Sequence, residues 1–200
     1  VFLRIEGTDK TFFEDTIYTT GHIVTTIKGG THECDGTNNG AHPMPGATII
    51  SAIDDAVSKW DGTYSKKYRD YFITSIEDDS SGWGLLVSYK FLDKGGCQTQ
   101  VAADDQVLVA AGAFSADAFL EARADKSSVP SGTEVVFTVV NGVDKKPVGG
   151  ATVLDGAGHT GTTNAEGKAT ITFGSPGVFK LKGTKEKTIR SNKVVITVTP

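Results

Sequence analysis

The sequence predicts two domains: a grasp-like α+β domain in residues 1–115, and an all-β sandwich in residues 116–200. Three observations predict this. The first half contains one stretch with helical periodicity among strand-like segments, the second half contains no helical period, and short strands recur there between Gly, Pro and Asn turns. A chain of 200 residues is long enough for each half to bury its own core.

The first half opens with strands. Val1–Gly7 alternates apolar and polar side chains, and Thr16–Ile27 predicts a hairpin or a bent pair of strands broken at Gly21. Gly29–Gly46 is too rich in Gly, Asn and Pro for regular structure, so it predicts a long loop. A loop of that length inside a domain is usually functional or held down by a cross-link.

The only helix predicted is the amphipathic stretch Thr48–Trp60, where Thr48 suits the N-cap and apolar residues recur at helical spacing. Two apolar segments, Tyr71–Ile76 and Trp83–Phe91, predict a hairpin closed by an acidic turn. Gln106–Phe114 predicts a buried strand. One helix packed on a mostly antiparallel sheet of these strands is the grasp-like arrangement.

The second half predicts strands punctuated by turn dipeptides, as in a β-sandwich. The six predicted strands are Phe119–Arg123, Glu134–Asn141, Ala151–Leu154, Lys168–Phe173, Gly177–Gly183 and Asn192–Thr199.

The net charge of -4 hides an asymmetry. Residues 1–115 carry 9 basic and 16 acidic side chains, whereas residues 116–200 carry 11 basic and 8 acidic ones. An acidic first half argues against a nucleic-acid partner, whose phosphates require a concentrated basic face. No apolar run approaches the roughly 20 residues that a membrane helix needs, so we expect no membrane span.

Cys34 and Cys97 are the only cysteines of the chain, and each adjoins a polar loop containing glycine. We predict a disulfide between them and, from it, an extracellular or cell-surface location; two unpaired thiols are the alternative.

Several aromatic residues near this hairpin could stack on a sugar ring or another flat ligand, or could instead form the core under the helix. They are Trp60, Tyr64, Tyr68, Tyr71, Phe72, Trp83 and Tyr89. The core interpretation is favoured for most of them. Trp83 is the exception, because Gly82 and Gly84 are expected to leave its indole accessible. The predicted ligand-binding residues are Trp83 and Tyr89, together with Asp35, Asn38 and His42 of the loop Asp35–His42.

Metal and catalytic motifs are incomplete. Asp35–Gly40 copies the first half of a calcium loop, but Gly46 stands where a glutamate is required, so a polar turn is the alternative. His32 and His42 fit no standard zinc spacing. There is no G-x-S-x-G or H-E-x-x-H motif. We therefore predict no catalytic residue and no cofactor, with structural calcium as a minor alternative.

The runs GATIISAIDDAV, YFITSIEDDSSGWGLLVSYKF and GCQTQVAADDQVLVAAGAF resemble secreted domains of unknown function that are similar to the C-terminal domain of transcobalamin and intrinsic factor. The matching positions are Trp83, Tyr89, Lys90, Asp104, Asp105, Val107 and Leu108. The resemblance covers about residues 1–115. It implies binding of a ligand or a surface outside the cell, without catalysis.

In the second half, KPVGGATV, TTNAEGKATITF, PGVFKLKG and IRSNKVVITV resemble bacterial Ig-like or carboxypeptidase-regulatory-like domains. That resemblance implies a secreted or surface protein and a spacer role for this half.

Together these features predict a secreted or cell-surface, non-catalytic binding protein whose partner is a glycan, a small molecule or a surface protein. One alternative is a structural adhesion module that makes protein–protein contacts, which a large apolar patch without a concave pocket would indicate. The other is an accessory module of a larger extracellular enzyme.

Overall fold

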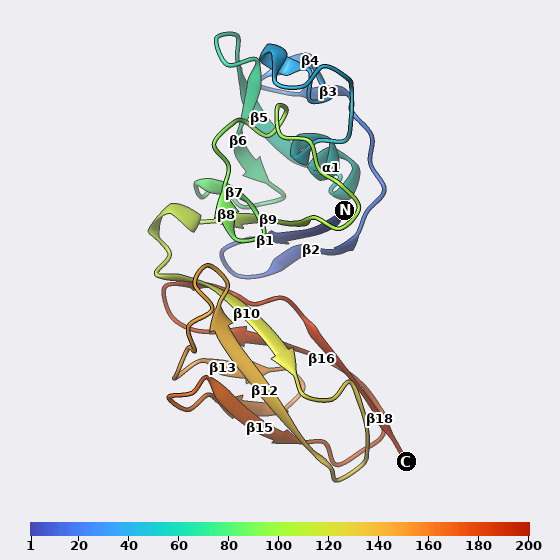
Figure 1. The fold of residues 1–200 in the computed structure, drawn as a ribbon, viewed down its shortest axis with the longest axis vertical. Helices are drawn as coiled ribbons and strands as arrows, with labels where there is room; N and C mark the ends of the chain where they lie inside the picture. The colour runs from blue at the N-terminus through green and yellow to red at the C-terminus, as the bar shows by residue number, and fades with distance from the viewer. The chain divides into compact units, whose positions relative to one another are not determined.

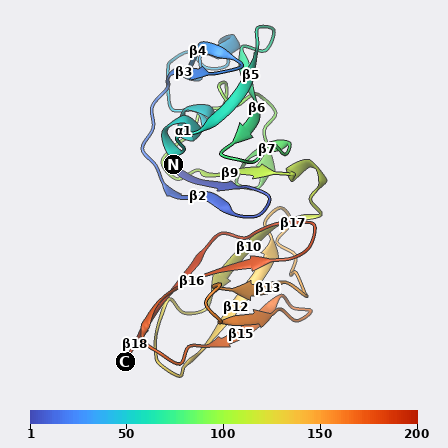
Figure 2. The same cartoon turned by 180° about the vertical axis from the view of Figure 1, so that it is seen from behind.

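The computed structural model describes residues 1–200, and the chain divides into two compact units, Val1–Phe114 and Ser115–Pro200 (Figure 1). The first unit runs from blue to green and the second from yellow to red; Figure 2 shows the same chain from behind. No helix of the chain is long and apolar enough to cross a bilayer.

The first unit combines one five-stranded sheet with two separate hairpins. Its elements are β1 (Phe2–Glu6), β2 (Thr11–Thr16), β3 (His22–Thr26), β4 (Gly30–Cys34), the 3-10 turn η1 (Asn38–Gly40), α1 (Ile49–Ala56), β5 (Trp60–Ser65), β6 (Asp70–Ile76), β7 (Trp83–Val87), β8 (Lys90–Phe91), β9 (Gln106–Ala111) and η2 (Ala113–Ser115), which ends at the next unit. The sheet has the order β2-β1-β9-β7-β8, and β1 and β9 run parallel. The hairpins are β3-β4 and β5-β6.

The predicted grasp-like α+β fold is wrong, because this unit is nearly all β and its single α-helix has only 8 residues. The helix ends at Ala56 since Val57 is extended (φ -128°, ψ 138°), and Trp60 begins β5 instead of completing the helix. Part of the predicted loop Gly29–Gly46 is also regular: β4 pairs antiparallel with β3.

The predicted hairpin of Tyr71–Ile76 with Trp83–Phe91 is also wrong. β6 pairs with β5, whereas β7 pairs with β9 in the other sheet. The intervening turn directs the chain away, because Glu77 adopts a left-handed conformation (φ 51°) and donates its backbone N–H to the carbonyl of Lys59. A second turn, with positive φ at Ser88 and Tyr89, splits Trp83–Phe91 into β7 and β8.

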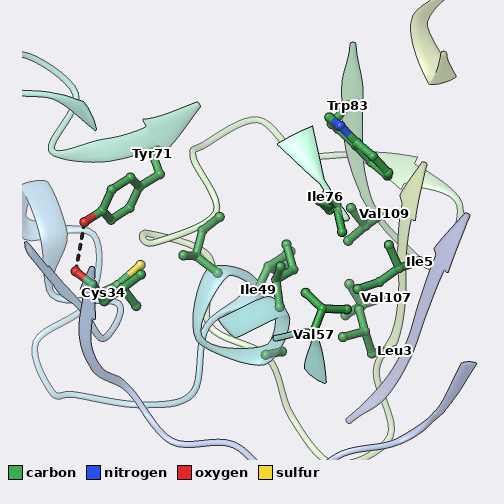
Figure 3. Packing of buried hydrophobic residues seen from close by; sticks show 14 of the residues in the cluster. Leu3, Ile5, Cys34, Ile49, Val57, Tyr71, Ile76, Trp83, Val107 and Val109 are labelled. Carbon is green, nitrogen blue, oxygen red and sulfur yellow. Dashed lines mark hydrogen bonds between the residues drawn. The ribbon is translucent and has the colours of Figure 1, made fainter. Parts of the chain in front are cut away.

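The core of the first unit lies between the sheet and α1 (Figure 3). Thr48 caps the helix as predicted: its hydroxyl accepts the Ser51 N–H, and the Ser51 hydroxyl accepts the Thr48 N–H. Apolar side chains of the helix and the sheet then meet without exposure to solvent; among them are Ile49, Ile53, Leu3, Ile5 and Val109.

The disulfide Cys34–Cys97 joins the end of β4 to the segment before β9, as predicted. The two residues are 63 positions apart in the sequence, their Cα atoms are 4.6 Å apart, and both side chains are fully buried. The bond therefore closes a loop that contains α1 and both β5 and β6.

The second unit is an Ig-like β-sandwich, as expected. Its strands are β10 (Ala118–Ala124), β11 (Ser128–Pro130), β12 (Glu134–Asn141), β13 (Thr152–Leu154), β14 (Thr160–Thr162), β15 (Lys168–Thr172), β16 (Gly177–Thr184), β17 (Thr188–Ile189) and β18 (Val194–Thr199). They form two sheets, β15-β12-β10-β17 and β11-β18-β16-β13-β14. Alternation places Phe137, Leu181 and Ile196 in the core with no exposure. The short strands β11, β14 and β17 were not predicted.

Removing the disulfide with the double substitution Cys34→Ala and Cys97→Ala is expected to lower the free energy of unfolding of the first unit by about 4 kcal/mol, because the unfolded chain regains the entropy of a long loop. Both tryptophans, Trp60 and Trp83, lie in the first unit, so tryptophan fluorescence during urea unfolding measures this loss. An unchanged midpoint of that transition would contradict a stabilising role for the bond.

Candidate functional site

The two aromatic residues predicted to contact a ligand, Trp83 and Tyr89, differ in their exposure to solvent. Trp83 is only 8% exposed, and its ring centroid lies 6.3 Å from that of Phe12. The expectation that the flanking glycines leave its indole accessible is therefore wrong, although its buried Nε1 has no hydrogen-bond partner. Tyr89 is half-buried in the β7–β8 turn, and the guanidinium of Arg4 lies 5.9 Å from its ring centroid.

The predicted polar contacts Asp35 and Asn38 are buried, and their side chains hold the loop itself. The Asp35 carboxylate accepts the N–H and the hydroxyl of Thr37 at 2.9 and 2.7 Å. The Asn38 side-chain amide donates to the backbone carbonyls of Glu33 and Arg69 at 2.8 and 3.0 Å. These bonds attach the loop to the β5–β6 hairpin.

The structure does not bring these five residues into one place. His42 is half-buried in the same loop as Asp35, but Trp83 lies at the far end of the core from Cys34 (Figure 3). Their role as ligand contacts stays a prediction.

A different cleft, of about 340 Å³, lies beside this loop in the first unit. It is bounded by the β5–β6 turn, by Asn39 of the loop, and by the segment 92–98, which ends beside the disulfide. Two aromatic rings lie at its rim: Tyr68 is 50% exposed and Phe72 is 56% exposed. Their centroids are 6.3 Å apart at an interplanar angle of 73°.

Strand alternation explains why Phe72 is exposed. In β6, Tyr71 points into the core, where it is 4% exposed, so its neighbour Phe72 points outward. The Tyr71 hydroxyl donates toward the carbonyls of Val24 and Gly30 at 2.9 and 2.7 Å, and burial raises its pKa to about 12. Tyr71 thus fixes β6 against the β3–β4 hairpin and, with it, the position of Phe72.

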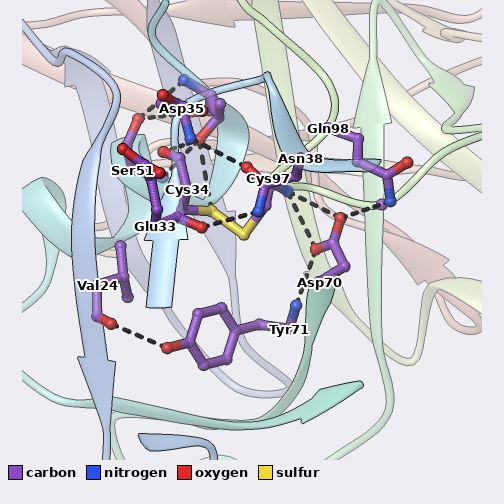
Figure 4. The surroundings of a disulfide bond; sticks show 12 residues. Val24, Glu33, Cys34, Asp35, Asn38, Ser51, Asp70, Tyr71, Cys97 and Gln98 are labelled. Atoms are coloured by element: carbon purple, nitrogen blue, oxygen red, sulfur yellow. Dashed lines mark hydrogen bonds between the residues drawn. A yellow bond between two sulfur atoms is a disulfide. The ribbon is translucent and has the colours of Figure 1, made fainter. Parts of the chain in front are cut away.

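The floor of the cleft is organised by Asp70, which is 2% exposed (Figure 4). Its Oδ1 accepts the N–H groups of Tyr71 and Cys97 at 2.9 and 3.1 Å, and its Oδ2 accepts the Gln98 Nε2 at 3.1 Å. Burial raises the pKa of Asp70, and these hydrogen bonds offset the rise only in part. Gly95 packs directly on the carboxylate, where the Cβ of any other residue would clash.

Gln98 lines the cleft with a side-chain amide that is held by hydrogen bonds. Its Nε2 donates to the carbonyl of Tyr68 at 2.9 Å and to Asp70, so both of its N–H groups are used. The Oε1 of the same amide accepts no hydrogen bond from the protein, and it is not fully buried. The cleft therefore combines two exposed ring faces with a polar floor held by hydrogen bonds.

No group of three or more His, Cys, Asp or Glu side chains is placed to hold a metal ion. His32 stacks on Tyr64, with centroids 3.5 Å apart, and bonds the carbonyl of Gly29.

His22 is the only histidine near a helix carboxylate, and both of its ring nitrogens are engaged. Nδ1 lies 2.7 Å from the carbonyl of Thr20, and Nε2 lies 3.2 Å from Asp54. Partial burial works to lower the pKa of His22, but these two partners outweigh it and raise the pKa. This arrangement ties β3 to α1 and leaves neither nitrogen to activate a nucleophile.

Sequence reasoning named Tyr68 and Phe72 among the aromatics, but favoured the core for most of that set, Phe72 included. The signal that separates them from Tyr71 is the register of β6, which the sequence alone does not fix.

The substitution Asp70→Ala is expected to destabilise the first unit by about 2 kcal/mol or more, because it leaves the N–H groups of Tyr71 and Cys97 without their acceptor. The measurement is urea unfolding followed by tryptophan fluorescence. Asp93→Ala removes an exposed carboxylate from the same cleft and is the matched control. Equal unfolding midpoints for the two variants would contradict the role given to Asp70.

No protein-family model matches the chain, and no curated protein matches it. The resemblance of the first half to the transcobalamin domains thus gains no support. Among solved structures, the chain is similar to the D00-D0 domain of Intimin, with 13% identity, a TM-score of 0.29, and coverage of 98% of this chain and 96% of that one. The Ig-like assignment of the second unit rests on its own strand order.

Proposed function

We propose that this chain is an extracytoplasmic, non-catalytic binding module that holds a glycan in the cleft between the β5–β6 turn and the segment 92–98. The observation that carries the proposal is the pair of exposed rings, Tyr68 and Phe72, above a floor fixed by Asp70 and Gln98.

The chemistry of the cleft suits a sugar. A pyranose has an apolar C–H face that packs on an aromatic ring and hydroxyl groups at its edge that donate and accept hydrogen bonds. The rings of Tyr68 and Phe72 offer the apolar contact, and Gln98 Oε1 offers an acceptor that is already oriented. A volume of about 340 Å³ lies at the lower end of the range for ligand sites, which favours one or two sugar residues of a longer chain.

The two cysteines support the proposed extracytoplasmic location. Both are in the disulfide, no free cysteine remains, and a stable buried disulfide is typical of oxidising compartments. An extracytoplasmic module of this kind meets glycans on cells and in the surrounding matrix.

An adhesion module that contacts other proteins is the second candidate. It is favoured by three exposed apolar residues in and around β3: Tyr18, Ile23 and Ile27 are 88%, 65% and 95% exposed. Scattered exposed apolar residues are common, so this observation weighs less than the built cleft.

The substitution Phe72→Ala is expected to weaken glycan binding about tenfold or more, because one ring contact is worth about 1 to 2 kcal/mol. The measurement is a glycan-array screen of the intact chain, followed by calorimetric titration of the best hit with each variant. Tyr18→Ala removes an even more exposed ring away from the cleft and should leave the Kd unchanged. An array without a hit, or a hit that is insensitive to Phe72→Ala, would reject the glycan proposal in favour of protein contacts.

A further inference from the structure

The charge around the cleft differs from that of the unit that contains it. The first unit carries 16 acidic and 9 basic side chains. Four of the nine basic residues nevertheless lie in the two segments that bound the cleft: Lys66, Lys67 and Arg69 in the β5–β6 turn, and Lys94 in the segment 92–98.

None of these four basic side chains takes part in an ion pair. Arg4, Lys10 and Lys28 of the same unit, in contrast, pair with Glu6, Asp78 and Asp61. The four residues are also exposed, so their charges face solvent. Cations left unpaired in an acidic unit are available to an anionic ligand.

One of the four, Lys94, lines the cleft, and a second, Lys67, lies beside a ring of its rim. The Lys67 ammonium lies 5.0 Å from the centroid of the Tyr68 ring, and Lys94 lines the cleft. Both can therefore reach a group that stacks on the rim.

Few carboxylates at the cleft oppose the charges of these four cations. Asp70 lies in the floor, but N–H donors of the protein already occupy both of its oxygens. Asp93 is the only exposed carboxylate that lines the cleft, whereas the two bounding segments carry four cations.

We propose that the cleft selects an anionic glycan, with a carboxylate or sulfate group held by Lys67 and Lys94 while the sugar ring stacks on Tyr68 and Phe72. This inference rests on the proposed glycan-binding function and narrows its ligand class. A sugar hydroxyl donating to Gln98 Oε1 completes the contact, since that atom accepts hydrogen bonds and would repel a second anion.

The test uses polysaccharides that share a backbone and differ in charge: dextran, carboxymethyl dextran and dextran sulfate, with the corresponding neutral, carboxymethyl and sulfated celluloses as a second backbone. We expect at least one charged form to bind about tenfold or more tightly than its neutral parent. The carboxymethyl and sulfate arms show which anion is preferred.

Three variants locate the binding. Lys67→Ala with Lys94→Ala should weaken binding of the charged form about tenfold or more, and Phe72→Ala should also weaken it. Lys59→Ala removes an exposed, unpaired cation before β5, at the opposite end of the hairpin from the turn, and should have no effect.

The outcomes separate this inference from the function on which it rests. Binding of neutral and charged forms with equal Kd, lost in Phe72→Ala, would keep the glycan-binding function and overturn the anionic selectivity. The charged forms could also bind the Phe72→Ala variant with an unchanged Kd, or inorganic polyphosphate could compete for the site as well as they do. Either result would show attraction to surface charge alone and overturn the inference. Failure of every polysaccharide to bind would overturn this inference, and together with a glycan array without a hit it would overturn the glycan-binding function as well.

Discussion

The first unit depends on one covalent and hydrogen-bonded junction. The disulfide fixes Cys97 against Cys34, and the N–H of Cys97 donates to Asp70 at the start of β6. Three segments distant in the sequence, which are the end of β4, the start of β6 and the segment before β9, are thereby joined inside the core (Figure 4). The cleft lies on this junction, because Asp70 and Gln98 form its floor.

This arrangement explains how a unit with one short helix keeps a defined surface. A two-stranded hairpin such as β5-β6 is only marginally stable alone. Here Tyr71 bonds the β3–β4 hairpin from one side, and Asp70 bonds the disulfide segment from the other. The exposed Phe72 lies directly after these two anchored residues, so the backbone that carries its ring is fixed before any ligand arrives. Such preorganisation lowers the entropy that binding must overcome.

The sequence predicted correctly those features for which few structural alternatives exist. Two cysteines allow one pairing, Thr48 with Ser51 makes a local cap, and the alternation of Glu134–Asn141 matches β12. It was misleading where strand partners had to be chosen. Nothing in Tyr71–Ile76 indicates that it pairs with the preceding segment and not with Trp83–Phe91. The burial of Trp83 and the exposure of Phe72 follow from that choice.

The central claim is that the disulfide and Asp70 together hold the floor of the cleft. Amide hydrogen exchange measured by NMR tests it directly, in the intact chain and in the double alanine variant of the cysteines. The account predicts slow exchange at residues 71 and 97 in the intact chain and faster exchange at both in the variant, with no change at Phe137 in the core of the second unit. Equal protection of residues 71 and 97 in the two proteins would contradict it.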